Sequence, residues 1–469
     1  MSCDPDPIVS YYRCPPRYIR WEVVEPRGGE LGFFRFGSHA IAYGSCSATK
    51  VSQNTVGPLE DSLLKATVSN GTVRLPFNLT DVIDNLRLER YVSALEGSMK
   101  SHATLLKDAY YFLRPFTPSL VRCGVQRMYY RGWKRIAFPR WPVDFSVDRT
   151  LQNFMTLLLR DGPDDCIPFI WFWPDGLSCC TIMTHDVEDE EGRAFCDSLM
   201  DIDDSFGVKS SFQVVPEQRY SVTPEFVARI CNRGFELNLH DLNHDGQLFR
   251  DRNTFLSRAR KINYYAKEFG AIGFRSGAMY RQPEWLKALE VSYDMSVPNV
   301  AHMEPQRGGC CTVMPYFIDG ILELPLTATQ DWALHNVLRQ QSSELWKQEI
   351  DLISAQHGLI SFIVHPDYTL TPQAQQAYRE LLAHIAELRS TKKAWVPLPR
   401  EVNEWWRQRA HMQMVQRRGQ WVIEGAGKER ARIAYARRVE GRLVYSFQPP
   451  IDPPAERTTE TEVAIRSGV

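Results

Sequence analysis

Short apolar runs alternate with helix-like segments between about residues 169 and 366, and this alternation limits the possible folds more than any other feature. Five of the runs are strand-like: Leu177 to Met183, Val208 to Val215, Glu236 to Leu239, Ala271 to Phe274 and Gly358 to Val364. Four segments between them have helical character: Glu191 to Phe206, Pro224 to Arg233, Asn253 to Phe269 and Pro283 to Glu290. Strands and helices that take turns form parallel sheets, so an α/β fold with a (β/α) barrel is expected. Reacting groups in such barrels lie at the C-terminal ends of the strands.

The regions on either side of this alternation have a different character, and 469 residues are too many for one compact core. We expect five parts: a mixed α/β region over 1–118, a basic linker helix region over 119–165, the barrel over 166–400, a small β appendage over 401–453 and a disordered tail over 454–469.

Charge and cysteine usage exclude several classes of protein. Lys+Arg number 55 and Asp+Glu 56, and this balance argues against nucleic acid as the main partner. The 11 cysteines show no regular framework, which is typical of reduced thiols in the cytosol. No apolar stretch approaches the ~20 residues that a membrane-spanning helix needs, and residues 1–16 do not resemble a signal peptide. A cytoplasmic protein without a transmembrane segment is expected.

Residues 119–140 contain six cations, no acid and several aromatic residues. The cations are Arg122, Arg127, Arg131, Lys134, Arg135 and Arg140. A helix of this composition can link two domains and pack its aromatic side chains on one of them. It can also make peripheral contact with an anionic membrane surface, so both interpretations stay open.

Two clusters of polar residues follow strand-like runs and could hold a metal ion or activate water. The cluster Thr184-His185-Asp186-Val187-Glu188 comes directly after Thr181-Ile182-Met183, so its two carboxylates, two residues apart, can both reach one mouth of a barrel. His240 and His244 follow the run that ends at Leu239, and a spacing of four allows two imidazoles to approach one ion on a helical turn. Each cluster alone is a weak indication, because solvated acids and surface histidines are common.

Two further strand ends contain a cation or an imidazole. Arg275 follows Gly273-Phe274 and could orient a carboxylate through a bidentate contact, although most arginines form surface salt bridges. His365 ends the run Ser361 to Val364 and precedes Pro366, a position suited to a general acid or base. A core histidine bonded to a backbone carbonyl would have the same sequence pattern.

The order of the four clusters resembles that of the polysaccharide deacetylases, carbohydrate esterase family four, from about Trp173 to Pro399. The resemblance implies that Asp186 is the catalytic base and Arg275 holds it. It also implies that His240 and His244 bind a metal ion and that His365 protonates the leaving amine. The fold implied is a distorted (β/α) barrel.

The chain departs from the family pattern at two places. Val187 stands where most members have a second aspartate that binds metal, so Glu188 is the expected third ligand and Asp186 the alternative. Asp331 matches loosely the family residue that tunes the acid histidine. The ligand set suits Zn²⁺, with Co²⁺, Mn²⁺ or Ni²⁺ also fitting.

The resemblance implies a metal-dependent hydrolase that removes N-acetyl groups from an amino-sugar-containing glycan or its precursor. Two other functions remain as alternatives. One is a metal-free amide hydrolase of the same fold that acts on a small molecule, because the usual second aspartate is missing. The other is a non-catalytic glycan-binding protein in which the β appendage binds the sugar.

Overall fold

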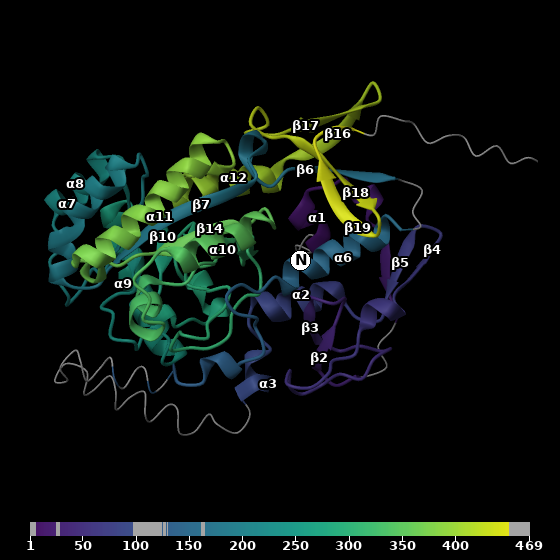
Figure 1. Ribbon diagram of the computed structural model, residues 1–469, viewed down its shortest axis with the longest axis horizontal. Coiled ribbons are helices and arrows are strands. Elements are labelled where there is room, and N and C mark those ends of the chain that lie inside the picture. The colour runs from purple at the N-terminus through teal and green to yellow at the C-terminus, as the bar shows by residue number, and fades with distance from the viewer. Residues whose placement is uncertain are drawn as a thin grey trace, which may run out of the picture.

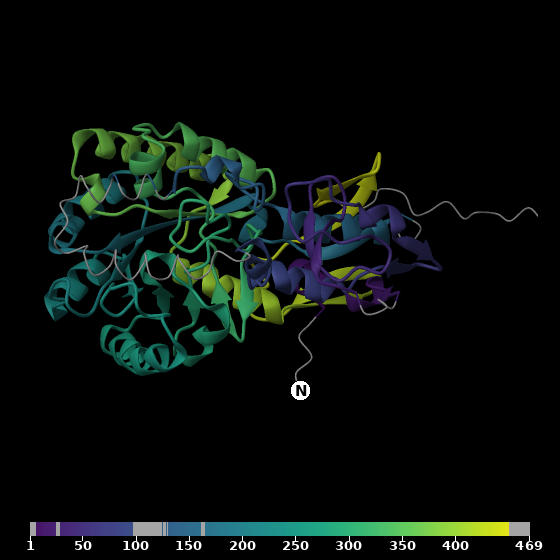
Figure 2. The same cartoon turned by 90° about the horizontal axis from the view of Figure 1, so that it is seen from below.

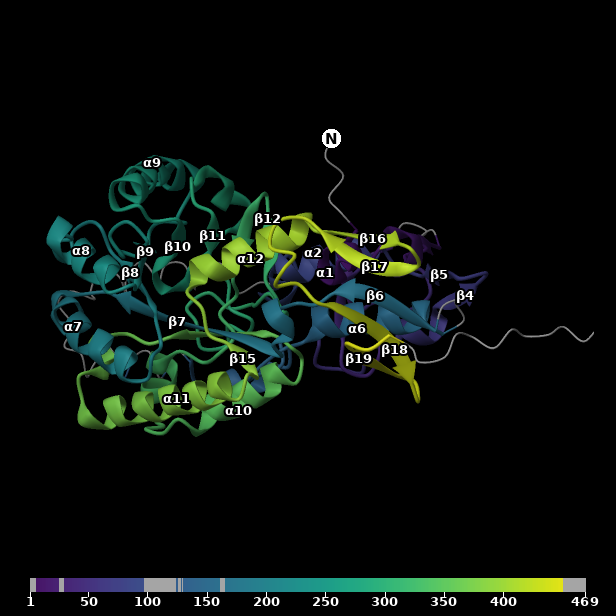
Figure 3. The same cartoon turned by 90° about the horizontal axis from the view of Figure 1, so that it is seen from above.

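The computed structural model describes residues 6–24, 29–96, 124, 128, 130–160 and 165–449. The described chain forms two bodies side by side, which Figures 1 and 2 show from two directions. One is the barrel, built from the middle of the chain, and the other combines the N-terminal and C-terminal segments. Figure 3 shows the strands of the barrel running between its outer helices.

Nine strands of the described residues form one large sheet in the order β12-β13-β11-β10-β9-β8-β7-β14, with β15 beside β7. Their bounds are β7 Cys179–Val187, β8 Ser211–Val214, β9 Glu236–His240, β10 Gly273–Arg275, β11 Tyr293–Asp294, β12 Tyr316–Ile318, β13 Ile321–Glu323, β14 Leu359–Ile363 and β15 Ala394–Trp395. All neighbours pair in parallel except β12 and β13. Every residue of the central strand β7 is buried, as expected for a parallel sheet covered on both faces.

Residues 326–328 close the sheet into a distorted barrel. Leu326 bridges to Pro298 and accepts a hydrogen bond from the N–H of Asn299 (2.7 Å). Two residues later, the N–H of Ala328 donates to the carbonyl of Ser361 on β14 (3.2 Å). The segment therefore lies between the chain after β11 and the far edge strand, which confirms the barrel expected from the sequence.

Helices cover the outside of the barrel: α7 Glu190–Ser205, α8 Pro224–Asn232, α9 Arg252–Phe269, α10 Glu344–Ser354 and α11 Pro372–Ser390. Side-chain caps define where several of them begin. Asp189, Thr223, Asp251 and Thr371 each accept a hydrogen bond from a backbone N–H in the first turn. A helical segment is expected over residues 283–290. The structure has a shorter 3₁₀ helix there, which spans Pro283–Ala288.

The second body combines both ends of the chain, as the purple and yellow ribbons of Figure 1 show. Its N-terminal elements are α1 Pro7–Tyr12, β1 Trp21–Val23, β2 Gly32–Arg35, β3 Ile41–Gly44, β4 Thr67–Ser69, β5 Thr72–Leu75, α2 Leu79–Arg87, α3 Val92–Glu96, α6 Ser146–Leu158 and β6 Cys166–Ile170. Its C-terminal elements are α12 Pro399–His411, β16 Gln413–Arg417, β17 Gln420–Glu424, β18 Ile433–Val439 and β19 Arg442–Ser446. One continuous apolar core joins the two sets.

Two local expectations for this body need correction. Residues 401–411 belong to helix α12, whereas a small β appendage is expected to begin at residue 401. Strand β6 lies at the start of the segment assigned to the barrel, yet it pairs with β18 in a separate three-stranded sheet. Apolar alternation identifies such strands but not their partners, because pairing across this much sequence depends on the tertiary fold.

Some expectations fall wholly or partly on residues that the structure does not describe. The expected tail over 454–469 lies outside the described residues, as does most of 119–129. Within residues 119–140, the described residues 124, 128 and 130 are helical, a 3₁₀ helix spans Trp133–Arg135, and residues 136–140 are not helical. No helix in the described part of the chain is both long enough and apolar enough to cross a membrane.

Candidate metal and catalytic site

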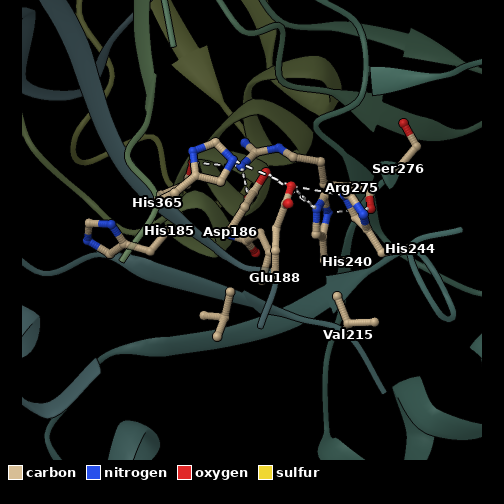
Figure 4. A network of polar contacts seen from close by, with 12 residues as sticks. His185, Asp186, Glu188, Val215, His240, His244, Arg275, Ser276 and His365 are labelled. Carbon is tan, nitrogen blue, oxygen red and sulfur yellow. Dashed lines mark hydrogen bonds and ion pairs between the residues drawn. The ribbon is translucent and has the colours of Figure 1, made fainter. Parts of the chain in front are cut away.

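The strand ends of the barrel bring five of the expected site residues to one place (Figure 4). Asp186 is the penultimate residue of β7, and Glu188 follows that strand. His240 and Arg275 end the neighbouring strands β9 and β10, where they are paired in register, and His365 comes just after β14. Because these strands are parallel, their C-terminal ends meet at one face of the barrel.

Glu188, His240 and His244 form the only group of three metal-binding side chains found among the described residues. One ligand atom from each lies within 4.8 Å of the other two. Glu188 Oε1 is 2.9 Å from His244 Nε2 and 3.8 Å from His240 Nε2. The Glu188 side chain is 16% exposed against 1% and 3% for the two histidines, so the opening of the site is on the side of Glu188.

The imidazole nitrogens that face Glu188 are buried and lack hydrogen bonds of good geometry. This holds for Nε2 of both His240 and His244, considered against the described residues. Buried polar atoms in proteins almost always have a partner, so two such atoms beside one carboxylate are suited to coordinate a cation. Two imidazoles and a carboxylate are a common donor set for Zn²⁺ and related divalent ions, and the residues present therefore fit a metal ion.

The two histidines are held by backbone contacts rather than by a helical turn. His240 Nδ1 lies 3.3 Å from the carbonyl of Arg275, which accepts its proton and leaves Nε2 free for a metal. His244 lies in the loop after β9 with a φ of 52°, so the expected helical turn is wrong. Arg219 supports this loop by donating to the carbonyl of His244 (2.6 Å), and its Nη2 is 3.4 Å from Nδ1 of the same residue.

Arg275 holds one oxygen of Asp186. Its Nη1 donates to Asp186 Oδ1 (2.6 Å) and also to Thr184 Oγ1 (2.8 Å), and the arginine is fully buried. Its Nε donates to the carbonyl of Met295 (3.1 Å), which fixes the plane of the guanidinium group. The second oxygen, Asp186 Oδ2, is 3.8 Å from His240 Nε2. Asp186 therefore has one fixed oxygen and one that faces the metal-binding group.

His365 is fixed by Asp331. Nδ1 of His365 donates to Asp331 Oδ1 (2.7 Å), and its backbone N–H donates to Oδ2 (2.6 Å). The two contacts set the tautomer and orient the ring, so that Nε2 lies 3.7 Å from Glu188 Oε1. In Figure 4 the Glu188 carboxylate lies between His365 on one side and the histidine pair on the other.

Burial and neighbouring charges set the protonation of the acidic and basic groups. Burial opposes ionisation of Asp186, but Arg275 and nearby imidazoles outweigh it and lower the pKa of that carboxyl. The pKa of Glu188 is likewise lowered well below its ordinary value, against the effect of burial, chiefly by His244 and His240. Burial also opposes charge on His365, yet Asp331, Glu188 and Asp186 together raise its pKa to about 10. A carboxylate and a protonated imidazole thus coexist at neutral pH.

His185 belongs to the same sequence cluster as Asp186 but points to the opposite side of β7. Its Nδ1 is 2.8 Å from the carbonyl of Val364, and its Nε2 is 3.1 Å from Asp203 Oδ2. Tyr378 and Ser210 also donate to Asp203. His185 therefore connects the end of β7 to the chain just before His365 and plays no direct part in the site.

A buried ion pair that sequence reasoning missed supports the wall of the site. Arg281 follows the loop at Gly277, where a Cβ would lie 2.9 Å from His244 Cδ2. The guanidinium of Arg281 donates to both oxygens of Glu89 (2.6 and 2.5 Å), which comes from the second body. The N–H of Gly309 donates to the same Glu89 Oε1 (2.5 Å). Because 192 positions separate Glu89 from Arg281, no local pattern could have revealed the pair.

The fold and side chains together define a (β/α) barrel with three side chains that could hold a metal ion, a carboxylate held by Arg275 and an imidazole held by Asp331. No protein-family model matches the chain, and no curated protein matches it. Several solved structures match the chain. One, from Mycobacterium smegmatis, is described as a polysaccharide deacetylase and is 20% identical in sequence. The match covers 54% of this chain and 98% of that chain, with a TM-score of 0.42. A family 4 acetyl xylan esterase from Clostridium thermocellum, in complex with a cobalt ion, matches with 13% identity, coverage of 48% and 91%, and a TM-score of 0.32. The PuuE allantoinase matches with 12% identity, coverage of 57% and 97%, and a TM-score of 0.39. At these identities and scores, the activity of this chain has to be argued from its own side chains.

Proposed function

We propose that the chain is a divalent-metal-dependent hydrolase that removes N-acetyl groups from an amino-sugar-containing glycan or its precursor. The main observation is the grouping at one opening of a metal-binding triad, a held carboxylate and a held, protonated imidazole. Amide hydrolysis needs these three elements, because water must be activated, charge on the carbonyl oxygen stabilised and the leaving amine protonated. The acetylated glycan as substrate comes from the resemblance of the motif order to that of the polysaccharide deacetylases.

Glu188, His240 and His244 would hold the ion, and Asp186 would stay outside the ligand set. Glu188 fits this role because its Oε1 approaches both imidazoles, whereas Asp186 is held by Arg275. A divalent ion here would increase the acidity of a water molecule and stabilise negative charge on the acetamide oxygen. Zn²⁺ suits the ligands best, and Co²⁺, Mn²⁺ and Ni²⁺ are alternatives.

Asp186 and His365 would move the protons. Asp186 Oδ2, the oxygen not held by Arg275, takes a proton from the attacking water as the new C–O bond forms. His365 Nε2 gives a proton to the nitrogen as the C–N bond breaks, so that acetate and a free amine leave. Asp331 keeps Nδ1 of His365 protonated and stabilises the imidazolium before transfer.

The test is release of acetate from a panel of N-acetylhexosamine oligomers, using metal-depleted protein with and without each added divalent ion. Metal-dependent release supports the proposal. Full turnover by the metal-free protein would favour the metal-free amide hydrolase. Oligomer binding without acetate release under any metal would favour the glycan-binding alternative.

A further inference from the structure

Three segments far apart in the sequence meet on one small apolar cluster beside the acid histidine. Trp133, Met303 and Ala333 form its buried centre, and Trp141, Trp332, Val337 and Leu338 pack around them. Tyr130 also contacts Trp332, with ring centroids 5.6 Å apart. Trp332 follows Asp331, the residue that holds His365. The cluster therefore fixes residues 130–141 against the loops around 303–307 and 332–340.

These three segments present six exposed cations. They are Arg131, Lys134, Arg135, Arg140, Arg307 and Arg339, called here the basic patch. The stretches 130–141 and 332–340 contain no aspartate or glutamate, and the one acidic residue of 303–307, Glu304, is buried. None of the six side chains forms an ion pair within the described part of the chain. The chain as a whole has a formal net charge of −1, so the patch is a local concentration of positive charge.

The basic patch lies on the same face of the barrel as the candidate site. Arg307 and Arg339 belong to loops that follow β11 and β13, and these loops lie at the C-terminal ends of the parallel strands. The site occupies the C-terminal ends of β7, β9, β10 and β14 on that same face. A partner that touches the patch would therefore lie next to the opening through which a substrate enters.

We propose that the basic patch docks on an anionic lipid surface and that the deacetylase acts on a membrane-attached glycan. Clusters of four to eight exposed Lys and Arg residues bind anionic headgroups, and half-buried tryptophans such as Trp141 and Trp332 are typical of the membrane–water boundary. The inference about the substrate rests on the proposed function, but lipid binding does not. Nucleic acid is the less favoured partner, because the near-neutral chain has no further excess of positive charge to follow a long polyanion.

The experiment measures sedimentation of the full-length protein with vesicles of phosphatidylcholine alone and with vesicles containing about 30 mol% phosphatidylserine. We expect binding to the anionic vesicles only, and we expect it to weaken as salt is raised. The variant Arg131→Gln/Lys134→Gln/Arg135→Gln/Arg339→Gln should bind at least ~50-fold more weakly, because each cation near an anionic surface contributes about fivefold. The single variants Lys134→Gln and Arg339→Gln should each bind anionic vesicles about fivefold more weakly. These two variants keep the test valid if the variant with four substitutions misfolds.

A matched control removes four exposed cations from the second body: Arg418→Gln/Lys428→Gln/Arg438→Gln/Arg442→Gln. This variant should bind anionic vesicles within about twofold of the wild type. An equal loss in the control, no binding of the wild type, or equally tight binding to single-stranded RNA at the same salt would each overturn the proposal. Glu188→Gln should bind vesicles normally, so failure of lipid docking is distinguishable from failure of the proposed catalysis.

Discussion

Arg275 Nη1 lies 2.6 Å from Asp186 Oδ1, while Asp186 Oδ2 remains 3.8 Å from His240 Nε2. This geometry indicates different roles for the two carboxylates at the C-terminal end of β7. Asp186 is neutralised by an arginine and stays available to accept a proton, whereas Glu188 has no arginine partner among the described residues and approaches both imidazoles. The same geometry predicts different outcomes for substitutions at the two positions.

The first prediction concerns Asp186. Asp186→Asn should lower the rate of acetate release by about 10²–10⁴-fold, because it removes the proton acceptor, and should leave metal affinity within about threefold of wild type. Steady-state kinetics and metal titration check the two parts. Unchanged turnover in this variant would show that Asp186 has a structural role and that Glu188 is the base.

The second prediction concerns Glu188. Glu188→Gln should weaken metal affinity by about 10-fold or more, because an amide is a much poorer ligand than a carboxylate, and leave the melting temperature of the metal-free protein unchanged. Competition with a chromophoric chelator measures the affinity. The matched control is Glu190→Gln, an exposed glutamate on α7 whose one ion pair among the described residues is with Arg193. Equal affinities in wild type and Glu188→Gln would transfer the ligand role to Asp186.

The third prediction concerns the pH dependence of turnover. Because the pKa of Asp186 is lowered, protonation of this base should reduce turnover of the metal-loaded protein only below the ordinary carboxyl range. The pKa of His365 is raised to about 10, so activity should fall on the alkaline side of the pH profile as this proton is lost. An ion bound by Glu188 cancels part of the nearby negative charge, so this alkaline limb should lie below pH 10. Asp331→Asn removes the carboxylate nearest His365, so the alkaline limb should move to lower pH in the profile of kcat against pH. An alkaline limb at the same pH in that variant would contradict the assignment.

The fourth prediction tests whether His365 is the general acid by comparing two substrates whose leaving groups differ in their need for a proton. His365→Ala should abolish most turnover of an acetamide but affect an activated aryl acetate much less, since a phenolate leaves without a proton. Parallel rate measurements on the two substrates check this. Equal losses on both substrates would show that His365 does not protonate the leaving group.

The fifth prediction concerns the buried pair between the two bodies. Glu89→Ala leaves the guanidinium of Arg281 buried without its carboxylate, so unfolding free energy should fall by about 3–5 kcal/mol. The comparison is Glu284→Ala, which breaks an exposed pair with Arg90 and should cost about 1 kcal/mol or less. Denaturant titration of both variants measures the difference. Equal stabilities would mean that the Glu89–Arg281 pair is unimportant for stability.

Part of the fold and of the site could be predicted from the sequence because the information is local. Apolar periodicity identified five of the nine strands of the barrel sheet, β7 to β10 and β14, but not β11, β12, β13 and β15. The residues at the ends of the identified strands, such as Asp186, His240 and Arg275, meet because parallel strands finish on one face. The side-chain alternation of β7 also explains why His185, between the strand core and Asp186, turns away from the site.

Other features could not be predicted because they depend on contacts between distant segments. Pairing of β6 with β18, the Glu89–Arg281 pair and the support of His244 by Arg219 all join residues with no shared local pattern. The basic patch is similar, since the sequence shows the cations of 130–140 but not that Arg307 and Arg339 lie beside them. Tertiary packing alone establishes these relationships.

The most direct test of the central claim is a metal titration of acetate release, run on wild type and on His240→Ala. Depleted wild-type protein should release no acetate from N-acetylhexosamine oligomers, and activity should return in proportion to the added ion until one equivalent per chain is bound. His240→Ala should bind the ion at least about 10-fold more weakly and recover little activity at one equivalent. Full activity in depleted wild-type protein, or wild-type affinity in His240→Ala, would contradict a metal centre formed by Glu188, His240 and His244.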